Sequence, residues 1–236
     1  MTDLFTNFRI KLVILFVAIF YLIFSTGIHG DDYIEIFRLS NSSIQDFFSP
    51  SLNDLGIYIY SLPTYFSLYW TFVWFGLESA WIYDLIKIVI HLSCLFFVYS
   101  FFKDYLSRDR AFITALIFIF IPLHDAANYW FMALSYIYVP AMLMFSHHLM
   151  NNNRYFLGII FGLFGAFAFY SSVPIIFGLS VIFLFHRKFN LFLIYVTPGI
   201  LYVTYYLFLK FELSTLEVKI SNSLSFGNYL KDVILQ

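Results

Sequence analysis

Long apolar stretches without a charged residue dominate this chain and restrict the folds open to it. Residues 12–28, LVILFVAIFYLIFSTGI, contain no Asp, Glu, Lys or Arg. About 20 apolar residues in a helix cross the roughly 30 Å of hydrocarbon in a bilayer, and a spanning segment must satisfy its backbone hydrogen bonds internally, which favours helices. The sequence therefore predicts an all-α integral membrane protein with about seven transmembrane helices, over residues 12–28, 81–102, 110–123, 130–149, 155–171, 173–186 and 189–209.

Composition points the same way. Of the 236 residues, 61% are hydrophobic and 11% are charged, whereas soluble domains are about half apolar and about a quarter charged. A net charge of −1 and the lack of a basic cluster give no reason to expect a nucleic-acid partner. Arg9 and Lys11 precede the first apolar run as they would in a signal peptide, but the run is long for one and further apolar segments follow, so we expect a retained helix.

The distribution of basic residues predicts the topology. Residues 56–76 are apolar enough to span, but they contain Pro63 and many Tyr and Trp, which favour the membrane interface. If this segment does not span, eight of the 13 Lys and Arg fall on the cytoplasmic side, as the positive-inside rule requires: Arg9, Lys11, Lys103, Arg108, Arg110, Arg154, Arg187 and Lys188. We therefore expect a cytoplasmic N-terminus, an external segment 29–80 holding interfacial or re-entrant helices, and an external tail over 210–236.

Acidic residues appear where the first helix should leave the membrane, in HGDDYIEIFRLS (29–40). Asp31 and Asp32 have two interpretations: a solvated helix end with a capping role, or a functional pair. The same topology puts HDAANYW (124–130) on the same side, so that His124 and Asp125 join them. Three carboxylates and a His could hold a divalent cation such as Mg or Mn, with Asp31 and Asp32 as ligands, or one Asp could act as a general base.

The next span adds a second polar group on one helical face. Asp84, Lys87 and His91 recur at intervals of three and four residues. One interpretation is an internal Asp84–Lys87 ion pair that neutralises two groups costly in a membrane. The other is that Lys87 and His91, together with Arg38 of the first external segment, bind a lipid phosphate.

Aromatic residues at the span ends mostly form an interfacial belt. Tyr129 and Trp130 are the best candidates for stacking on a sugar. The lone Cys94 excludes an internal disulfide.

The order of these features resembles a known family. An apolar helix precedes Asp31-Asp32-Tyr33; a Tyr- and Pro-containing stretch, GIYIYSLPTYFSLYWTFVWFGLESAW, follows; then come LSRDR, a helix ending IFIFIPLHD, and YWFMALSYIYVPAMLMFSHHL. Over residues 8–209 this order is similar to the N-terminal transmembrane module of GT-C superfamily membrane glycosyltransferases, of the protein O-mannosyltransferase and aminoarabinose-transferase type.

The resemblance implies a function. Such enzymes move a sugar from a polyprenyl-phosphate donor to a glycan, lipid or protein acceptor at the external membrane face, and an acidic residue of the first external loop is essential. That role would fall on Asp31 or Asp32, and a second external acid on Asp125. Residues 33–80 would form juxtamembrane helices. The setting implied is a bacterial inner membrane and the synthesis of a cell-envelope glycan.

Two departures leave alternatives open. Lys87 stands near where family members commonly carry an Arg, and the chain is shorter than most members, so the region 1–209 would be a module whose tail is truncated or whose remainder is a partner chain. A non-catalytic membrane subunit and a lipid-linked-sugar transporter or flippase are the other functions the sequence allows. Near-apolar spans over 110–123, 155–171 and 189–209 disfavour the transporter.

Overall fold

The computed structural model describes residues 8–23, 26–40, 62–120, 130–169 and 171–218, and within these ranges it is helical without a strand. The prediction of an all-α fold is therefore confirmed for the described residues. The chain divides into two units, Met1–Gly199 and Ile200–Gln236. The helices are α1 (Phe8–Leu22), α2 (Asp31–Ser40), α4 (Leu62–Phe75), α5 (Ala80–Lys103), α6 (Arg108–Phe120), the 3-10 turn η3 (Met132–Leu134), α8 (Ser135–Asn151), α9 (Tyr155–Ala168), α10 (Ser172–Phe185) and α11 (Phe189–Val218).

Each predicted span contains a helix, but the lengths differ from the prediction. Two helical segments among the described residues are long and apolar enough to cross a membrane, Ala80–Lys103 and Phe189–Phe208. Helices α9 and α10 have 14 residues each, or about 21 Å at 1.5 Å per residue, which is short of the roughly 30 Å of hydrocarbon. Length and composition therefore support two crossings and do not support seven.

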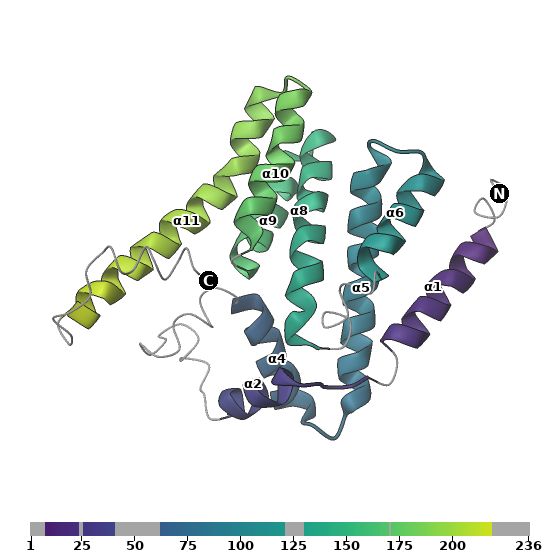
Figure 1. Ribbon diagram of the computed structural model, residues 1–236, viewed down its shortest axis with the longest axis vertical. Coiled ribbons are helices and arrows are strands. Elements are labelled where there is room, and N and C mark those ends of the chain that lie inside the picture. Colours follow the sequence, from purple (N-terminus) through teal and green to yellow (C-terminus); the bar gives the residue numbers. More distant parts are fainter. Residues whose placement is uncertain (1–7, 24–25, 41–61, 121–129, 170, 219–236) are drawn as a thin grey trace. The chain divides into compact units, whose positions relative to one another are not determined.

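Helices α5, α6, α8, α9 and α10 of the first unit run up and down in alternation (Figure 1). Short turns connect α5 to α6, α8 to α9 and α9 to α10, and this keeps neighbouring helices antiparallel. Buried apolar residues from α5, α6 and α8 form one core cluster, which includes Val98, Ala115 and Ile137. The bundle is thus built from helices that are neighbours in the sequence.

The close packing of α9 against α8 depends on glycine. A Cβ on Gly165 would lie 2.8 Å from Cδ2 of Leu143, and one on Gly158 would lie 2.6 Å from Cγ of Met150. The missing side chains let the hydroxyl of Ser146 donate a hydrogen bond of 2.6 Å to the carbonyl of Gly158. Small residues at this spacing are typical of helices that pack closely in membranes.

The first unit has two chemically different ends. At one, which we call the basic end, lie the start of α1 and the turns 103–110, 151–154 and 185–189 (Figure 1). His148 Nδ1 lies 2.9 Å from Asp104 Oδ2, and Lys188 donates to Asn151 across 2.6 Å, so these turns are joined to one another. At the opposite end, which we call the acidic end, lie residues 26–40, 76–84 and 130–135, which include Asp31, Asp32 and Asp84 (Figure 1).

Candidate functional site

The candidate site is built around the connection from α1 to α2. Gly27 and Gly30 adopt positive φ angles of 59° and 51°, a backbone conformation that glycine enters without strain. Gly30 has a second constraint, because a Cβ there would lie 2.9 Å from the ring of Trp130. Two sharp bends thus turn the chain from α1 into α2, and Trp130 packs against the second bend.

Helix α2 is amphipathic and begins at the acidic pair. Ile36 is buried in a cluster with Leu68 of α4 and Phe131, whereas Tyr33 and Phe37 are 54% and 75% exposed. A short helix with one packed face and one exposed aromatic face fits a position along a membrane interface. The helix predicted within residues 29–80 therefore begins where the acidic residues stand.

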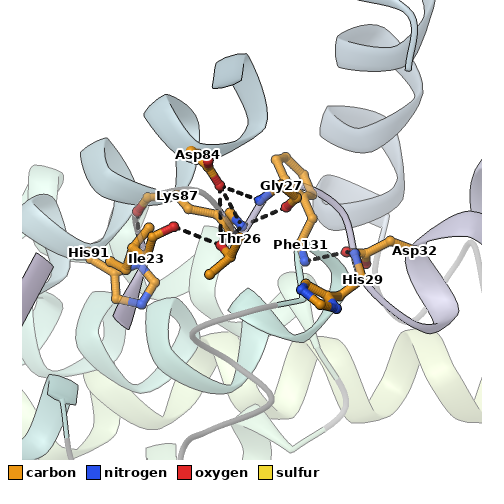
Figure 2. Close-up of polar contacts among 9 residues, drawn as sticks. All are labelled: Ile23, Thr26, Gly27, His29, Asp32, Asp84, Lys87, His91 and Phe131. Carbon is orange, nitrogen blue, oxygen red and sulfur yellow. Dashed lines mark hydrogen bonds and ion pairs between the residues drawn. The ribbon is translucent and has the colours of Figure 1, made fainter. Parts of the chain in front are cut away.

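Asp32 is buried and already hydrogen-bonded. Its Oδ2 accepts a bond of 2.7 Å from the backbone N–H of Phe131 and one of 3.3 Å from that of His29 (Figure 2), and the residue is 0% exposed. Bonds from N–H donors to a carboxylate are among the stronger ones in proteins. Asp32 therefore ties the start of α2 to the segment before α8, and its carboxylate is not the solvated helix end that the sequence allowed.

The described structure includes Asp31 as the first residue of α2, but its side chain lies outside the described part. The side chain of Arg38 also lies outside it, as do His124, Asp125 and Tyr129 entirely. Their assigned roles therefore stay predictions.

Asp84 and Lys87 form the ion pair that the sequence spacing allowed. Their charged atoms lie 3.0 Å apart on α5, and the Lys87 side chain is 0% exposed. Lys87 also donates to Thr26 Oγ1 at 2.5 Å and to the carbonyl oxygen of Gly27 at 2.6 Å (Figure 2). An ammonium group has three N–H donors, and Asp84, Thr26 and Gly27 each offer it an acceptor at hydrogen-bond distance.

The carboxylate of Asp84 completes this cluster. Its Oδ1 accepts a bond of 2.6 Å from the backbone N–H of Gly27 and lies 3.2 Å from Thr26 Oγ1. Asp84 and Lys87 thus hold both the N–H and the carbonyl of Gly27, at the first sharp bend. We call the contacts of these two residues with Thr26 and Gly27 the α5 clamp.

His91 lies one turn further along α5 and is buried. Its Nδ1 is 2.7 Å from the carbonyl oxygen of Lys87, and because a carbonyl only accepts, this nitrogen carries the hydrogen. The ring stacks on Phe120 at 6.0 Å. His91 and Lys87 therefore make internal contacts in this structure, and a phosphate would have to displace contacts already made to Lys87.

An open hollow of about 470 Å³ lies beside the α5 clamp. Thr26, Gly27 and Asp84 supply its polar side. The apolar side comes from Ile28, Tyr33, Ala80, Trp81, Leu85 and Ile88. Polar groups at one side of an otherwise apolar hollow are typical of ligand sites.

The predicted divalent cation needs several oxygen ligands close together. No group of three or more His, Cys, Asp or Glu suitable for a metal occurs among the described residues. N–H donors occupy Oδ2 of Asp32, and Lys87 neutralises Asp84. The roles given to Asp31 and Asp32 as metal ligands remain untested, and no chemical step below uses a metal.

Sequence reasoning missed four partners in this site: Thr26, Gly27 and the backbone N–H groups of His29 and Phe131. The only local signal was the spacing of Gly27 and Gly30 immediately before two acids, which marks a sharply bent connection.

Comparison of the chain with protein-family models, with curated proteins and with solved structures finds no match.

Proposed function

We propose that this chain is the transmembrane module of a glycosyltransferase that takes a sugar from a polyprenyl-phosphate donor and transfers it at the face of the acidic end. One observation carries the proposal. The Asp31-Asp32 pair begins a short amphipathic helix directly after the first apolar helix, in a bent connection held beside an open hollow. A lipid-linked donor keeps its tail in the bilayer and its sugar at the membrane surface. An active site at the membrane boundary can therefore reach that sugar directly.

Asp31 is the better candidate for the base. The Asp32 carboxylate is buried and engaged by two N–H groups, which suits a positioning residue. In the proposed reaction Asp31 takes the proton of an acceptor hydroxyl as that oxygen bonds to the anomeric carbon of the donor, whose bond to the phosphate oxygen breaks. The leaving phosphate keeps the electron pair, and Arg38 offsets its charge. His124, Tyr129 and Trp130 would bind the acceptor, and Asp125 would supply the second acid.

The topology belongs to the same proposal. The chain lies in a bacterial inner membrane with the basic end cytoplasmic and the acidic end external. The shorter helices α1, α6, α8, α9 and α10 also cross, in a locally thinned bilayer or extended by neighbouring residues. Helices α2 and α4 lie along the external interface, as expected for the exposed aromatic face of α2.

Substitution of the acidic pair tests the chemistry. Membranes are prepared from cells that express Asp31→Asn, Asp32→Asn or the double variant. These membranes are supplied with a labelled polyprenyl-phosphate sugar, and transfer of the labelled sugar is measured. Because Asp31→Asn loses a positioned base, its rate of sugar transfer should fall by about 10²-fold or more. Glu35→Gln, which removes one carboxylate from the same helix, is the matched control and should keep near wild-type transfer.

The Asp32→Asn variant should lose activity together with thermal stability, because its side chain connects two segments. Unchanged transfer in both single variants and in the double variant would overturn the catalytic assignment. An inactive wild-type chain that elutes with a second protein would instead favour the non-catalytic subunit.

A further inference from the structure

A second hollow, of about 270 Å³, lies at the basic end between α1, α5 and α6. Lys11, Arg108 and Asp109 form its charged side, and Leu12, Leu15, Tyr99 and Phe112 form the rest. It shares no residue with the hollow at the acidic end. Neither the proposed reaction nor its substrates involve it.

Charge and apolar surface are ordered along all three helices. Lys11 is followed four residues later by Leu15, Arg108 by Phe112, and Tyr99 by Lys103. Residues four apart lie on the same helical face, about one turn or 6 Å apart along the axis. Each helix therefore places a cation at the end of the bundle and an apolar or aromatic residue one turn deeper, as at the boundary between lipid headgroups and acyl chains.

The charges of this hollow do not cancel. Lys11 pairs with Asp109, and its ammonium lies 5.4 Å from the centre of the Phe112 ring. Arg108 is exposed and has no ion pair among the described residues. The lining therefore carries a net charge of +1, from two cations and one carboxylate, and within the described part of the chain no carboxylate pairs with the guanidinium on its charged side.

The apolar side of the hollow is continuous with an exposed apolar surface. Leu12 lines the hollow and is 48% exposed, and Val13, Phe16 and Val17 continue along α1 with more than half of their surfaces uncovered. An occupant that matches both parts needs an anionic head and an apolar tail. Inorganic phosphate would leave the apolar wall uncovered, and a zwitterionic lipid would not use the net positive charge.

We propose that this hollow binds an anionic phospholipid, with its phosphate at Arg108 and an acyl chain against Leu12, Leu15 and Phe112. The bound lipid would fill the space between α1 and α6, which the Lys11–Asp109 pair joins at this end. Arginine is suited to the phosphate because its planar guanidinium donates two parallel hydrogen bonds.

Binding is measured by native mass spectrometry on the full chain in mild detergent, titrated with phosphatidylglycerol or with phosphatidylcholine. Wild type should bind phosphatidylglycerol preferentially. One cation near an anionic surface contributes about 1 kcal/mol, or about fivefold in affinity, so Arg108→Gln should weaken binding about fivefold. Asp109→Asn, which raises the net charge of the lining to +2, should strengthen it by a similar factor.

Arg154→Gln is the matched control. Arg154 is an exposed cation at the same end, at the start of α9 and outside the hollow, so its loss should change affinity less than twofold. A photoactivatable phosphatidylglycerol should form adducts on α1 and α6. Equal affinity for the two lipids, equal effects of Arg108→Gln and Arg154→Gln, or adducts confined to other helices would each overturn the proposal. Competition by inorganic phosphate at lipid-like concentrations would also do so, since it would show a simple anion site.

Discussion

Both ends of the first unit contain sharp turns next to helices, but different residue types adopt the positive φ angles of these turns. At the acidic end the positive φ angles fall on Gly27, Gly30 and Gly76, whereas at the basic end they fall on Asn153 and Arg187. Glycine adopts this conformation freely, while a residue with a Cβ is strained in it. The acidic end thus uses residues suited to its backbone geometry, and the basic end tolerates strain at Arg187 while keeping a positive charge there.

The two ends also differ in how deeply their polar contacts are buried. The basic end links exposed and half-buried side chains, such as Lys188 with Asn151, over the outside of the turns. The acidic end buries its charges: Asp32 and Lys87 are both 0% exposed. Partly exposed pairs contribute little to stability and tolerate change, whereas buried charges depend on every partner. The acidic end therefore holds its polar groups in fixed positions, whereas the basic end leaves its side chains room to adapt.

The largest difference between the ends should appear on removing a lysine. Lys87→Met leaves Asp84 buried without its cation and releases Thr26 and Gly27, and breaking such a pair costs about 3–5 kcal/mol. Lys103→Met, on an exposed lysine at the other end of α5, should change the free energy of unfolding by less than about 0.5 kcal/mol. Unfolding of both variants is followed by thermal melting in detergent.

The double variant Asp84→Asn/Lys87→Met separates the buried charge from the lost contacts. It should recover part of the stability that Lys87→Met loses, because no unpaired charge remains. Equal stability of Lys87→Met and Lys103→Met would contradict the α5 clamp and the contrast between the ends.

The clamp also shows what was predictable from the sequence. Apolar runs located the helices, because burial and lipid exposure both demand contiguous apolar residues. The charge sorting put the turns 103–110, 151–154 and 185–189 on one side, and they lie at one end of the first unit (Figure 1). The spacing of Asp84 and Lys87 allowed the ion pair that forms, since neighbours at three residues share a helical face. These are local rules, and they held where the relevant partners are close in the sequence.

Long-range partners were not predictable in the same way. Lys87 contacts Gly27 across 60 residues, and Asp32 contacts Phe131 across 99. In both cases the partner is a backbone group, which every residue possesses, so the sequence carries no distinguishing mark. The same reason explains why Lys87 looked suited to a phosphate: the sequence shows its charge but not the acceptors that the α1–α2 connection brings to it.

A smaller effect is expected from adding one methyl group at the acidic end. Gly30→Ala combines a positive φ with a Cβ 2.9 Å from the Trp130 ring, and overpacking of this kind costs about 1–3 kcal/mol. Gly76 has a positive φ of 63°, and a Cβ there would meet nothing within 4 Å. Backbone strain alone should therefore lower the free energy of unfolding of Gly76→Ala, by about 1–2 kcal/mol. A Gly76→Ala variant that melts below Gly30→Ala would show that the Trp130 contact is not limiting.

The smallest effect on the free energy of unfolding is expected at the basic end, and it should be stabilising. Arg187 has φ 57° and follows His186, the C-cap of α10. Its N–H bonds to the carbonyl of Leu184, and the next N–H, of Lys188, bonds to that of Phe183. This arrangement ends many helices and is usually made by glycine at the position of Arg187. Arg187→Gly should therefore raise the free energy of unfolding by about 1 kcal/mol, measured as a higher melting temperature.

Arg187→Ala separates strain from charge, because it removes the cation but keeps a Cβ at the positive φ. It should melt near wild type, below Arg187→Gly. If alanine and glycine stabilise equally, repulsion among the basic turns and not backbone strain limits this end. If glycine stabilises and alanine does not, the wild-type chain keeps a strained arginine for its charge. Orientation of both variants in membranes, measured by protease accessibility, then tests that reason, because each removes one of the eight cations that favour the basic end as the cytoplasmic side.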